Sequence, residues 1–239
     1  MLRDLPSNFD DIQAVMGRLP AQGAPVRLVK QYKGLELSQD VRLVEVTPER
    51  AALEAIRLNY CTILEGEIHL HSHAFPKPMT ARLTDFDYEK GMIFLTDFAF
   101  RDWKERQYER VQPREPTYVT VHCRRRDCRA FLEDISLTGA ALLMKRDHEH
   151  EMRAQPGNRL TLDFELAQLY RFTHVKGIMC YVRPVGEALL KAGIRLFPTM
   201  KQARQLQAYI AWRREEILDE VNQSFIKRRA PRGVEALFF

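Results

Sequence analysis

Arg106-Gln-Tyr-Glu-Arg110 and, further along, Asp134-Ile-Ser136-Leu-Thr-Gly139 are the two stretches that decide the fold of this chain of 239 residues. The first places two arginines on an R-x-x-x-R spacing, and the planar guanidinium binds phosphates and purine edges through paired hydrogen bonds. The second supplies a carboxylate acceptor, a small hydroxyl and a glycine that allows close backbone approach. Taken alone, D-x-S-x-x-G also fits an ordinary β-turn.

Strand-like segments surround both stretches. From Thr117 onward, apolar residues alternate with polar ones, and turn signals such as Gln155-Pro-Gly-Asn158 separate the segments. The predicted strands are 118–124, 129–135, 139–145, 159–165, 170–182 and 190–197. Short strands of this number suit a small closed barrel. A helix is predicted over 200–225, with one apolar stripe formed by Ala203, Leu206, Ile210, Ile217 and Val221.

The first hundred residues show a similar but less regular pattern. An amphipathic helix is predicted over 7–19, followed by strands at 25–30, 41–46, 63–71, 80–86 and 91–95. This alternation indicates an antiparallel β domain. The charged and aromatic stretch 98–114 breaks the alternation, which predicts a linker that carries the arginine pair.

The order and separation of the two motifs resemble those of PilZ-domain receptors for cyclic di-GMP, in the two-domain form of the flagellar-brake proteins. The resemblance implies a mainly β chain with two antiparallel β-barrel-like domains, the second a six-stranded barrel followed by a long α-helix. It implies an N-terminal β domain with a short leading helix over 1–100, and a linker with R-x-x-x-R over 101–114. The PilZ domain with its helix would cover 115–226, and 227–239 would form a tail.

The resemblance also assigns roles to individual residues. Arg106 and Arg110 would clamp the phosphates and guanine O6/N7 edges of cyclic di-GMP from a flexible linker. Asp134 would accept hydrogen bonds from the guanine N1/N2 edge, Ser136 would bind phosphate or ribose, and Gly139 would admit the ligand close to the backbone. Binding would change the interdomain arrangement and regulate a downstream protein in motility, biofilm formation or secretion. Glu105, just before the pair, would repel additional phosphate and favour one ligand per site.

Composition favours a binding protein of the cytoplasm. The formal charge is +5, from 37 Lys and Arg against 32 Asp and Glu, and a modestly basic surface suits a nucleotide, a nucleic acid or an anionic lipid. The chain opens without a signal peptide, and no apolar run approaches the ~18 residues of a membrane span. No nucleophile elbow, P-loop or dinucleotide fingerprint occurs, so no enzyme and no cofactor besides the ligand are expected.

Two further features need an explanation. The three imidazoles of His69-Leu-His71-Ser-His73 would share one face of a strand and could hold Zn²⁺. A solvent-facing polar row is the other explanation, and no metal is expected because no matching carboxylate motif follows. The four cysteines are scattered, and Cys123 and Cys128 lack a second pair at zinc spacing.

The alternative function is a basic β-barrel that binds RNA or single-stranded DNA. Arg124-Arg-Arg126 would supply charge, and Tyr118, Phe131 and Trp103 would supply stacking surfaces. Such binding should weaken steeply with salt, whereas a dinucleotide held by a few fixed contacts should depend on salt less. The sequence leaves the identity of a protein partner and the oligomeric state open.

Overall fold

The computed structural model describes residues 12, 14–17, 25–47, 49–55, 66–87, 89–101, 106–123, 126–146 and 155–229. The chain divides into two compact units, and residues 33–35 and 106–217 make up the second of them. The two units are described separately below. Of the leading helix predicted over 7–19, Ile12 and residues 14–17 are helical, and its other residues lie outside the described ones.

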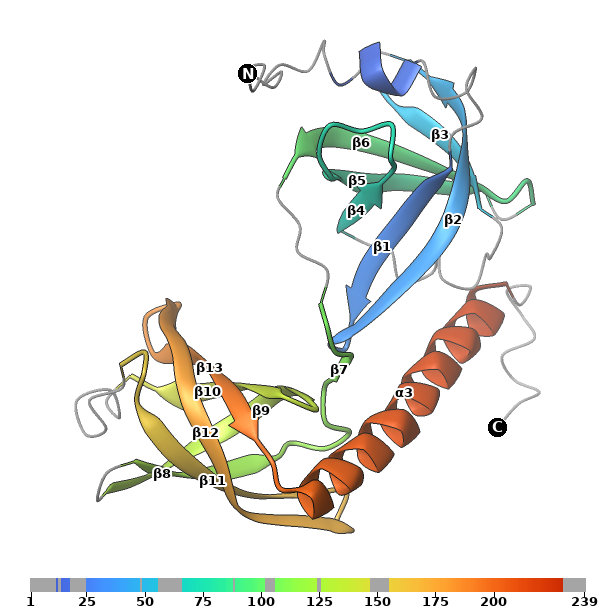
Figure 1. Cartoon of the computed structure of the whole chain (residues 1–239). Helices are drawn as coiled ribbons and strands as arrows, with labels where there is room; N and C mark the ends of the chain where they lie inside the picture. Colours follow the sequence, from blue (N-terminus) through green and yellow to red (C-terminus); the bar gives the residue numbers. More distant parts are fainter. Residues whose placement is uncertain are drawn as a thin grey trace. The chain divides into compact units, whose positions relative to one another are not determined.

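The first unit is built on a closed antiparallel barrel with the strand order β1-β2-β3-β6-β5-β4 (Figure 1). Its strands are β1 (Val26–Tyr32), β2 (Leu35–Val46), β3 (Ala51–Ala55), β4 (Glu67–His71), β5 (Met79–Asp87) and β6 (Met92–Phe100). Side chains alternate between barrel interior and solvent, most regularly along β2, and this alternation gives the core. The core side chains that are fully shielded from solvent include Leu53, Ile68, Leu70, Met79, Ile93 and Leu95.

Strand β3 was not predicted from the sequence. Ala51-Ala-Leu-Glu-Ala55 contains residues that favour helices, and no β-branched or aromatic side chain marks it as a strand. Its pairing with β2 on one side and β6 on the other makes it a strand. Tertiary pairing therefore overrides local preference in this segment.

The second unit holds a barrel with the order β10-β13-β12-β11-β8-β9, closed by the pairing of β9 with β10. Its strands are β8 (Tyr118–Cys123), β9 (Arg126–Ser136), β10 (Gly139–Lys145), β11 (Arg159–Leu166), β12 (Tyr170–Val185) and β13 (Leu189–Phe197). Each overlaps a strand predicted from the alternating pattern. The predicted fold class, two β-barrels with a six-stranded second barrel followed by a helix, is confirmed.

A short strand before this barrel differs from the prediction. Arg110 and Val111 form β7 and pair with Ser136 and Ile135 of β9, where an unpaired linker was expected. The Val111 side chain is fully buried, which anchors the strand. At its other end, the charged stretch 98–114 begins within β6, which continues to Phe100. Arg110 therefore belongs to the sheet and not to a flexible linker.

Helix α3 (Met200–Arg229) follows the second barrel. Thr199 caps its start: the Gln202 backbone N–H donates to the Thr199 hydroxyl, and the Thr199 N–H donates to the Gln202 side chain. Of the predicted stripe, Leu206, Ile210, Ile217 and Val221 are buried, and Ala203 is partly buried. Tyr209 and Arg213, which the stripe did not include, are buried as well. Over the described residues, no helix has the length and apolar character needed to cross a membrane.

Candidate ligand-binding site

A cavity of about 640 Å³ in the second unit brings both sequence motifs together. Its lining includes four of the five predicted site residues, Arg106, Arg110, Ser136 and Gly139. The remainder of the lining is Gln107, Tyr108, Thr138, Ala140, Cys180, Tyr181 and residues 193–197. A volume of this size lies in the range of small-molecule sites, about 300–1,000 Å³.

Arg110 is positioned by Asp134. One guanidinium nitrogen, Nη1, lies 3.1 Å from Oδ1 of the carboxylate. Asp134 is 9% exposed and does not line the cavity, whereas the Arg110 side chain is 32% exposed. The carboxylate therefore lies behind the arginine and fixes the direction in which it points, while other N–H groups of the fork remain for a ligand.

Ser136 and Gly139 flank the two-residue turn between β9 and β10. The Ser136 hydroxyl is 2% exposed and donates a hydrogen bond of 3.2 Å to the Gly139 carbonyl. A Cβ atom on residue 139 would lie 3.3 Å from the Ser136 Oγ and 3.6 Å from Nη2 of Arg110. Glycine thus leaves the space in which the serine and the arginine pack. The motif closes the hairpin and forms one wall of the cavity.

Arg106 lies at the cavity beside a turn of the preceding sequence. Its Nη1 donates a hydrogen bond of 3.0 Å to the carbonyl of Gly34, and the Gln112 N–H donates one of 2.7 Å to the carbonyl of Lys33. Gly34 has φ +82°, and a Cβ there would lie 3.1 Å from the Gln112 nitrogen. The turn 33–35 belongs to the second unit and requires glycine at residue 34.

Helix α3 holds the chain just after the arginine pair. Arg213 is 2% exposed, and its Nε donates to the Gln112 carbonyl at 3.1 Å. Its Nη1 lies 3.1 Å from Oε2 of Glu216, whose Oε1 lies 3.0 Å from Nη1 of Arg114. The helix therefore fixes the backbone that leads out of β7 and, with it, the position of Arg110.

The cavity also has a wall that the motifs did not indicate. Tyr181 of β12 lies directly across from Gly193 of β13. A Cβ atom on residue 193 would fall 2.1 Å from the tyrosine ring, so the ring lies flat against the glycine backbone. Arg195 and Phe197 continue this strand along the cavity. The alternation of residues 193–197 predicted a strand, but only the pairing of β12 with β13 places these side chains at the site.

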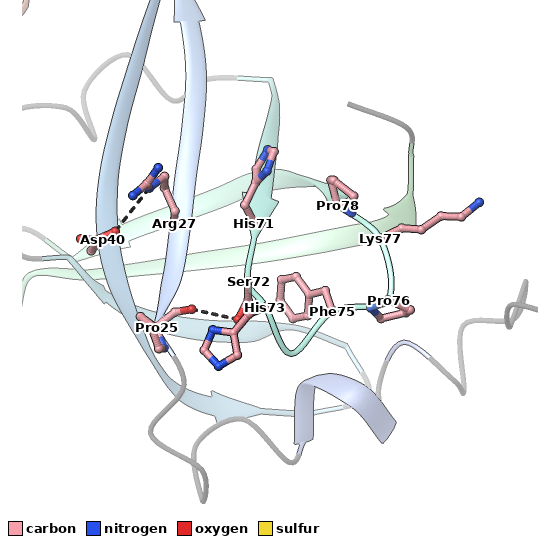
Figure 2. A pocket seen from close by; sticks show the side chains of 10 residues that line it. All are labelled: Pro25, Arg27, Asp40, His71, Ser72, His73, Phe75, Pro76, Lys77 and Pro78. Carbon is pink, nitrogen blue, oxygen red and sulfur yellow. Dashed lines mark hydrogen bonds and ion pairs between the residues drawn. The ribbon is translucent and has the colours of Figure 1, made fainter. Parts of the chain in front are cut away.

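The three histidines of the first unit do not form a metal site. β4 ends at His71, so His73 lies in the turn that follows and leaves the face predicted for it. Figure 2 shows the rings of His71 and His73 pointing away from each other, in a hollow of about 340 Å³. Burial lowers the pKa of His69, the third member of the row. In the described part of the chain, no cluster of His, Cys, Asp or Glu could hold a metal ion.

Several residues named from the sequence lie outside the described ones. They are Trp103, Glu105, Arg124, Arg125 and the tail from residue 230. Of the stacking surface expected for a nucleic acid, Tyr118 and Phe131 pack edge to face, with centroids 6.1 Å apart. The Arg129 guanidinium lies 3.9 Å from the centre of the Tyr118 ring and covers one of its faces.

The second unit matches the model of a known domain. The model of the PilZ domain matches residues 104–212. Among solved structures, the chain is similar to YcgR of Escherichia coli in complex with c-di-GMP, at 19% identity, 91% coverage of this chain and 95% of that chain, and TM-score 0.46. It is also similar to the MrkH–c-di-GMP complex of K. pneumonia, at 15% identity, 93% and 98% coverage, and TM-score 0.45. The Bacillus subtilis inhibitor of motility, MotI/DgrA, follows at 14% identity, 81% and 97% coverage, and TM-score 0.42.

No curated protein matches the chain. The domain match covers the second barrel, the arginine pair before it and the first part of α3. Residues 104–212 therefore form a PilZ domain.

Proposed function

We propose that this protein is a receptor for cyclic di-GMP and that the ligand occupies the cavity lined by Arg106 and Arg110. The observation that carries the proposal is the meeting of R-x-x-x-R and D-x-S-x-x-G at one cavity of a PilZ domain. The function is binding and signalling without catalysis. Because the ligand is a cytoplasmic messenger of bacteria, the proposal places the protein in that compartment.

The residues at the cavity supply the contacts that a cyclic dinucleotide needs. Arg110, oriented by Asp134, presents its remaining N–H groups to a phosphate or to a guanine O6/N7 edge. Arg195 adds a third guanidinium to the lining. The rings of Tyr108 and Tyr181, each 38% exposed, offer flat surfaces on which guanine can stack.

Ligand binding would also act on the segment around the arginine pair. Arg106 donates to the carbonyl of Gly34, so a phosphate that recruits this guanidinium competes with the turn 33–35. This turn joins β1 to β2, and its release would alter the interdomain arrangement. Such a change follows only if cyclic di-GMP binds the altered arrangement more tightly. A downstream protein would then respond to the altered arrangement.

Isothermal titration calorimetry with cyclic di-GMP tests the proposal, with GTP and cyclic GMP as competing nucleotides. Of the three nucleotides, the wild-type protein should bind only cyclic di-GMP. The Arg106→Ala/Arg110→Ala double variant should lose this binding. Arg171→Ala is the matched control, because Arg171 is an exposed arginine of β12 outside the cavity. Wild-type affinity in the double variant would exclude this site.

The alternative of a nucleic-acid-binding barrel has weaker support in the described residues. A stacking platform needs open aromatic faces, and Arg129 occupies one face of Tyr118. The two functions differ in salt dependence. Binding of a single-stranded oligonucleotide that falls steeply with salt, together with no heat from cyclic di-GMP, would favour the alternative.

A further inference from the structure

A second hollow of the PilZ barrel, about 550 Å³ in volume, lies on the outer face of four neighbouring strands. It is lined by residues of β8, β11, β12 and β13, and Phe197 is the one lining residue named for both this hollow and the candidate ligand site. We propose that this groove docks an acidic segment of a partner protein. The inference concerns a surface beyond the cyclic di-GMP cavity and does not require that ligand.

One wall of the groove is a row of side chains in register. His122 of β8 pairs with Thr161 of β11, which pairs with Lys176 of β12, which in turn pairs with Phe197 of β13. Opposite residues of paired strands carry side chains about 5 Å apart. Because neighbouring strands are spaced by about 4.8 Å, the row runs roughly 14 Å across the sheet.

The other wall is formed by Arg159 and Ile178, which pair with each other two residues along β11 and β12. The paired residues between the two walls are Leu160 and Gly177. The Leu160 side chain is buried, and a Cβ atom on residue 177 would meet the interior methyl Cγ2 of Ile194 at 2.7 Å. Backbone therefore forms the floor, and the groove runs across the strands between two rows of side chains.

The groove carries unbalanced positive charge. Arg159 and Lys176 are both exposed, and among the described residues neither has a carboxylate partner. Elsewhere on this barrel, Lys191 is paired with Glu133. At one end of the row, the carboxylates of Asp127 and Asp163 both contact the His122 ring.

These features select the chemistry of the partner. Carboxylates of an acidic segment complement Arg159 and Lys176, and an apolar side chain between them can cover Phe197, which is 48% exposed. About four residues of extended chain span ~14 Å, the width of the row. A nucleic acid needs a longer track of cations with repeated stacking surfaces, and the groove offers one exposed aromatic ring.

The test is an NMR titration of the full ¹⁵N-labelled chain, without cyclic di-GMP, using a short acetylated peptide of alternating Glu and Leu. We expect the largest amide shifts at Thr161, Lys176 and Phe197. The Arg159→Gln/Lys176→Gln double variant should weaken binding roughly fivefold, since each exposed ion pair contributes modestly. The Lys145→Gln/Arg171→Gln variant removes the same charge outside the groove and should bind as wild type.

Three results would overturn the docking groove. One is an equal weakening of peptide binding in both double variants, which would mean that the net charge of the protein alone attracts the peptide. Another is tighter binding of an oligothymidylate than of the acidic peptide with shifts at the same amides, which would assign the groove to nucleic acid. The third is the absence of shifts in the groove at millimolar peptide. Because cyclic di-GMP is absent throughout, none of these results bears on the proposed receptor function.

Discussion

Arg110 and Asp134 face each other from β7 and β9, with Nη1 of the guanidinium 3.1 Å from Oδ1 of the carboxylate. The pair joins the two sequence motifs physically. Since Asp134 is nearly shielded from water and Arg110 is only partly so, the carboxylate orients the arginine toward the cavity. We therefore propose that the aspartate positions the arginine that lines the cavity, whereas the sequence predicts a direct contact between Asp134 and guanine.

Substitution of the two arginines should therefore have different effects on stability. Both Arg106→Ala and Arg110→Ala should weaken cyclic di-GMP binding at least tenfold, because a charge-assisted bidentate contact is worth ~1.5–3 kcal/mol. Arg110→Ala should also lower the free energy of unfolding by about 1–2 kcal/mol, since it leaves the shielded Asp134 carboxylate without its partner.

Calorimetry and urea denaturation measure these two quantities on the same variants. Asp134→Ala is the companion change, and it should weaken binding although Asp134 does not line the cavity. Undiminished binding by Asp134→Ala would reduce the D-x-S-x-x-G motif to a structural turn. Equal unfolding free energies for Arg110→Ala and wild type would show that the ion pair does not stabilise the barrel.

Gly139 should tolerate no larger side chain at the site. A Cβ atom would lie 3.3 Å from the Ser136 Oγ and 3.6 Å from Arg110 Nη2, so Gly139→Ala should displace the arginine and Gly139→Leu should also fill the cavity. We expect both variants to bind cyclic di-GMP more weakly, with leucine the worse. Gly17→Ala is the control, because no atom lies within 4 Å of the added methyl group. Binding by Gly139→Leu at wild-type strength would place the ligand elsewhere.

Arg213 and Arg214 are adjacent in α3, and comparing their variants tests the contact between the helix and the segment after β7. The Arg213 side chain is 3% exposed and donates to the Gln112 carbonyl, whereas Arg214 is 42% exposed and lies 3.2 Å from Glu109. Arg213→Ala should lower the free energy of unfolding by about 2–4 kcal/mol because Gln112 and Glu216 lose their partner. Arg214→Ala should cost less than about 1 kcal/mol.

Thermal or urea unfolding of the two variants gives the comparison directly. If binding is measured as well, Arg213→Ala should weaken cyclic di-GMP binding, because the Gln112 carbonyl that it holds follows Arg110 closely in the chain. Similar stabilities for the two variants would mean that α3 does not fix this segment.

Most strands of the second barrel could be predicted because they have one buried face and therefore alternate, whereas β10 is an apolar run that is buried along most of its length. β7 could not, since two residues carry no period and its only anchor is the buried Val111. The sequence pattern also did not predict the burial of Arg213, because a charged residue next to an apolar stripe is normally solvated. Residues of the R-x-x-x-R and D-x-S-x-x-G motifs lie on one side of the cavity. The side formed by Tyr181 and Gly193 depends on the register of β12 with β13, which no local pattern encodes.

The pH dependence of stability should report the cluster around His122. The pKa of His122 is raised above 6.5 mainly by its hydrogen bond with Asp127, 2.8 Å away, with a further contribution from Asp163. The His174 ring stacks on the His122 ring with centroids 6.1 Å apart, and the His174 backbone N–H donates to Asp163. A folded pKa above the unfolded one adds stability that is fully present below about pH 6.5 and disappears as pH rises through the folded value.

His122→Gln should remove this dependence. The free energy of unfolding of the wild type should fall relative to that of the variant as pH increases from about 6 to above the raised pKa. An NMR titration of the His122 ring should give a midpoint above 6.5. Urea midpoints across this interval are the measurement. Parallel curves for the two proteins would show that the histidine titrates alike in the folded and unfolded states.

Ligand binding should change the interdomain arrangement and leave the fold of each barrel unchanged. Arg106 contacts Gly34 in the turn between β1 and β2, and the same arginine lines the candidate cavity, so ligand and turn compete for one guanidinium. A coupling of about 1–3 kcal/mol between ligand and arrangement is typical of regulatory proteins. Small-angle scattering with saturating cyclic di-GMP should differ from that of the unliganded protein, and amide exchange should slow over residues 106–112. The Arg106→Ala variant should show neither change. Identical scattering and exchange in wild type, with binding verified by calorimetry, would leave a receptor that signals through the exposed surface of the bound ligand.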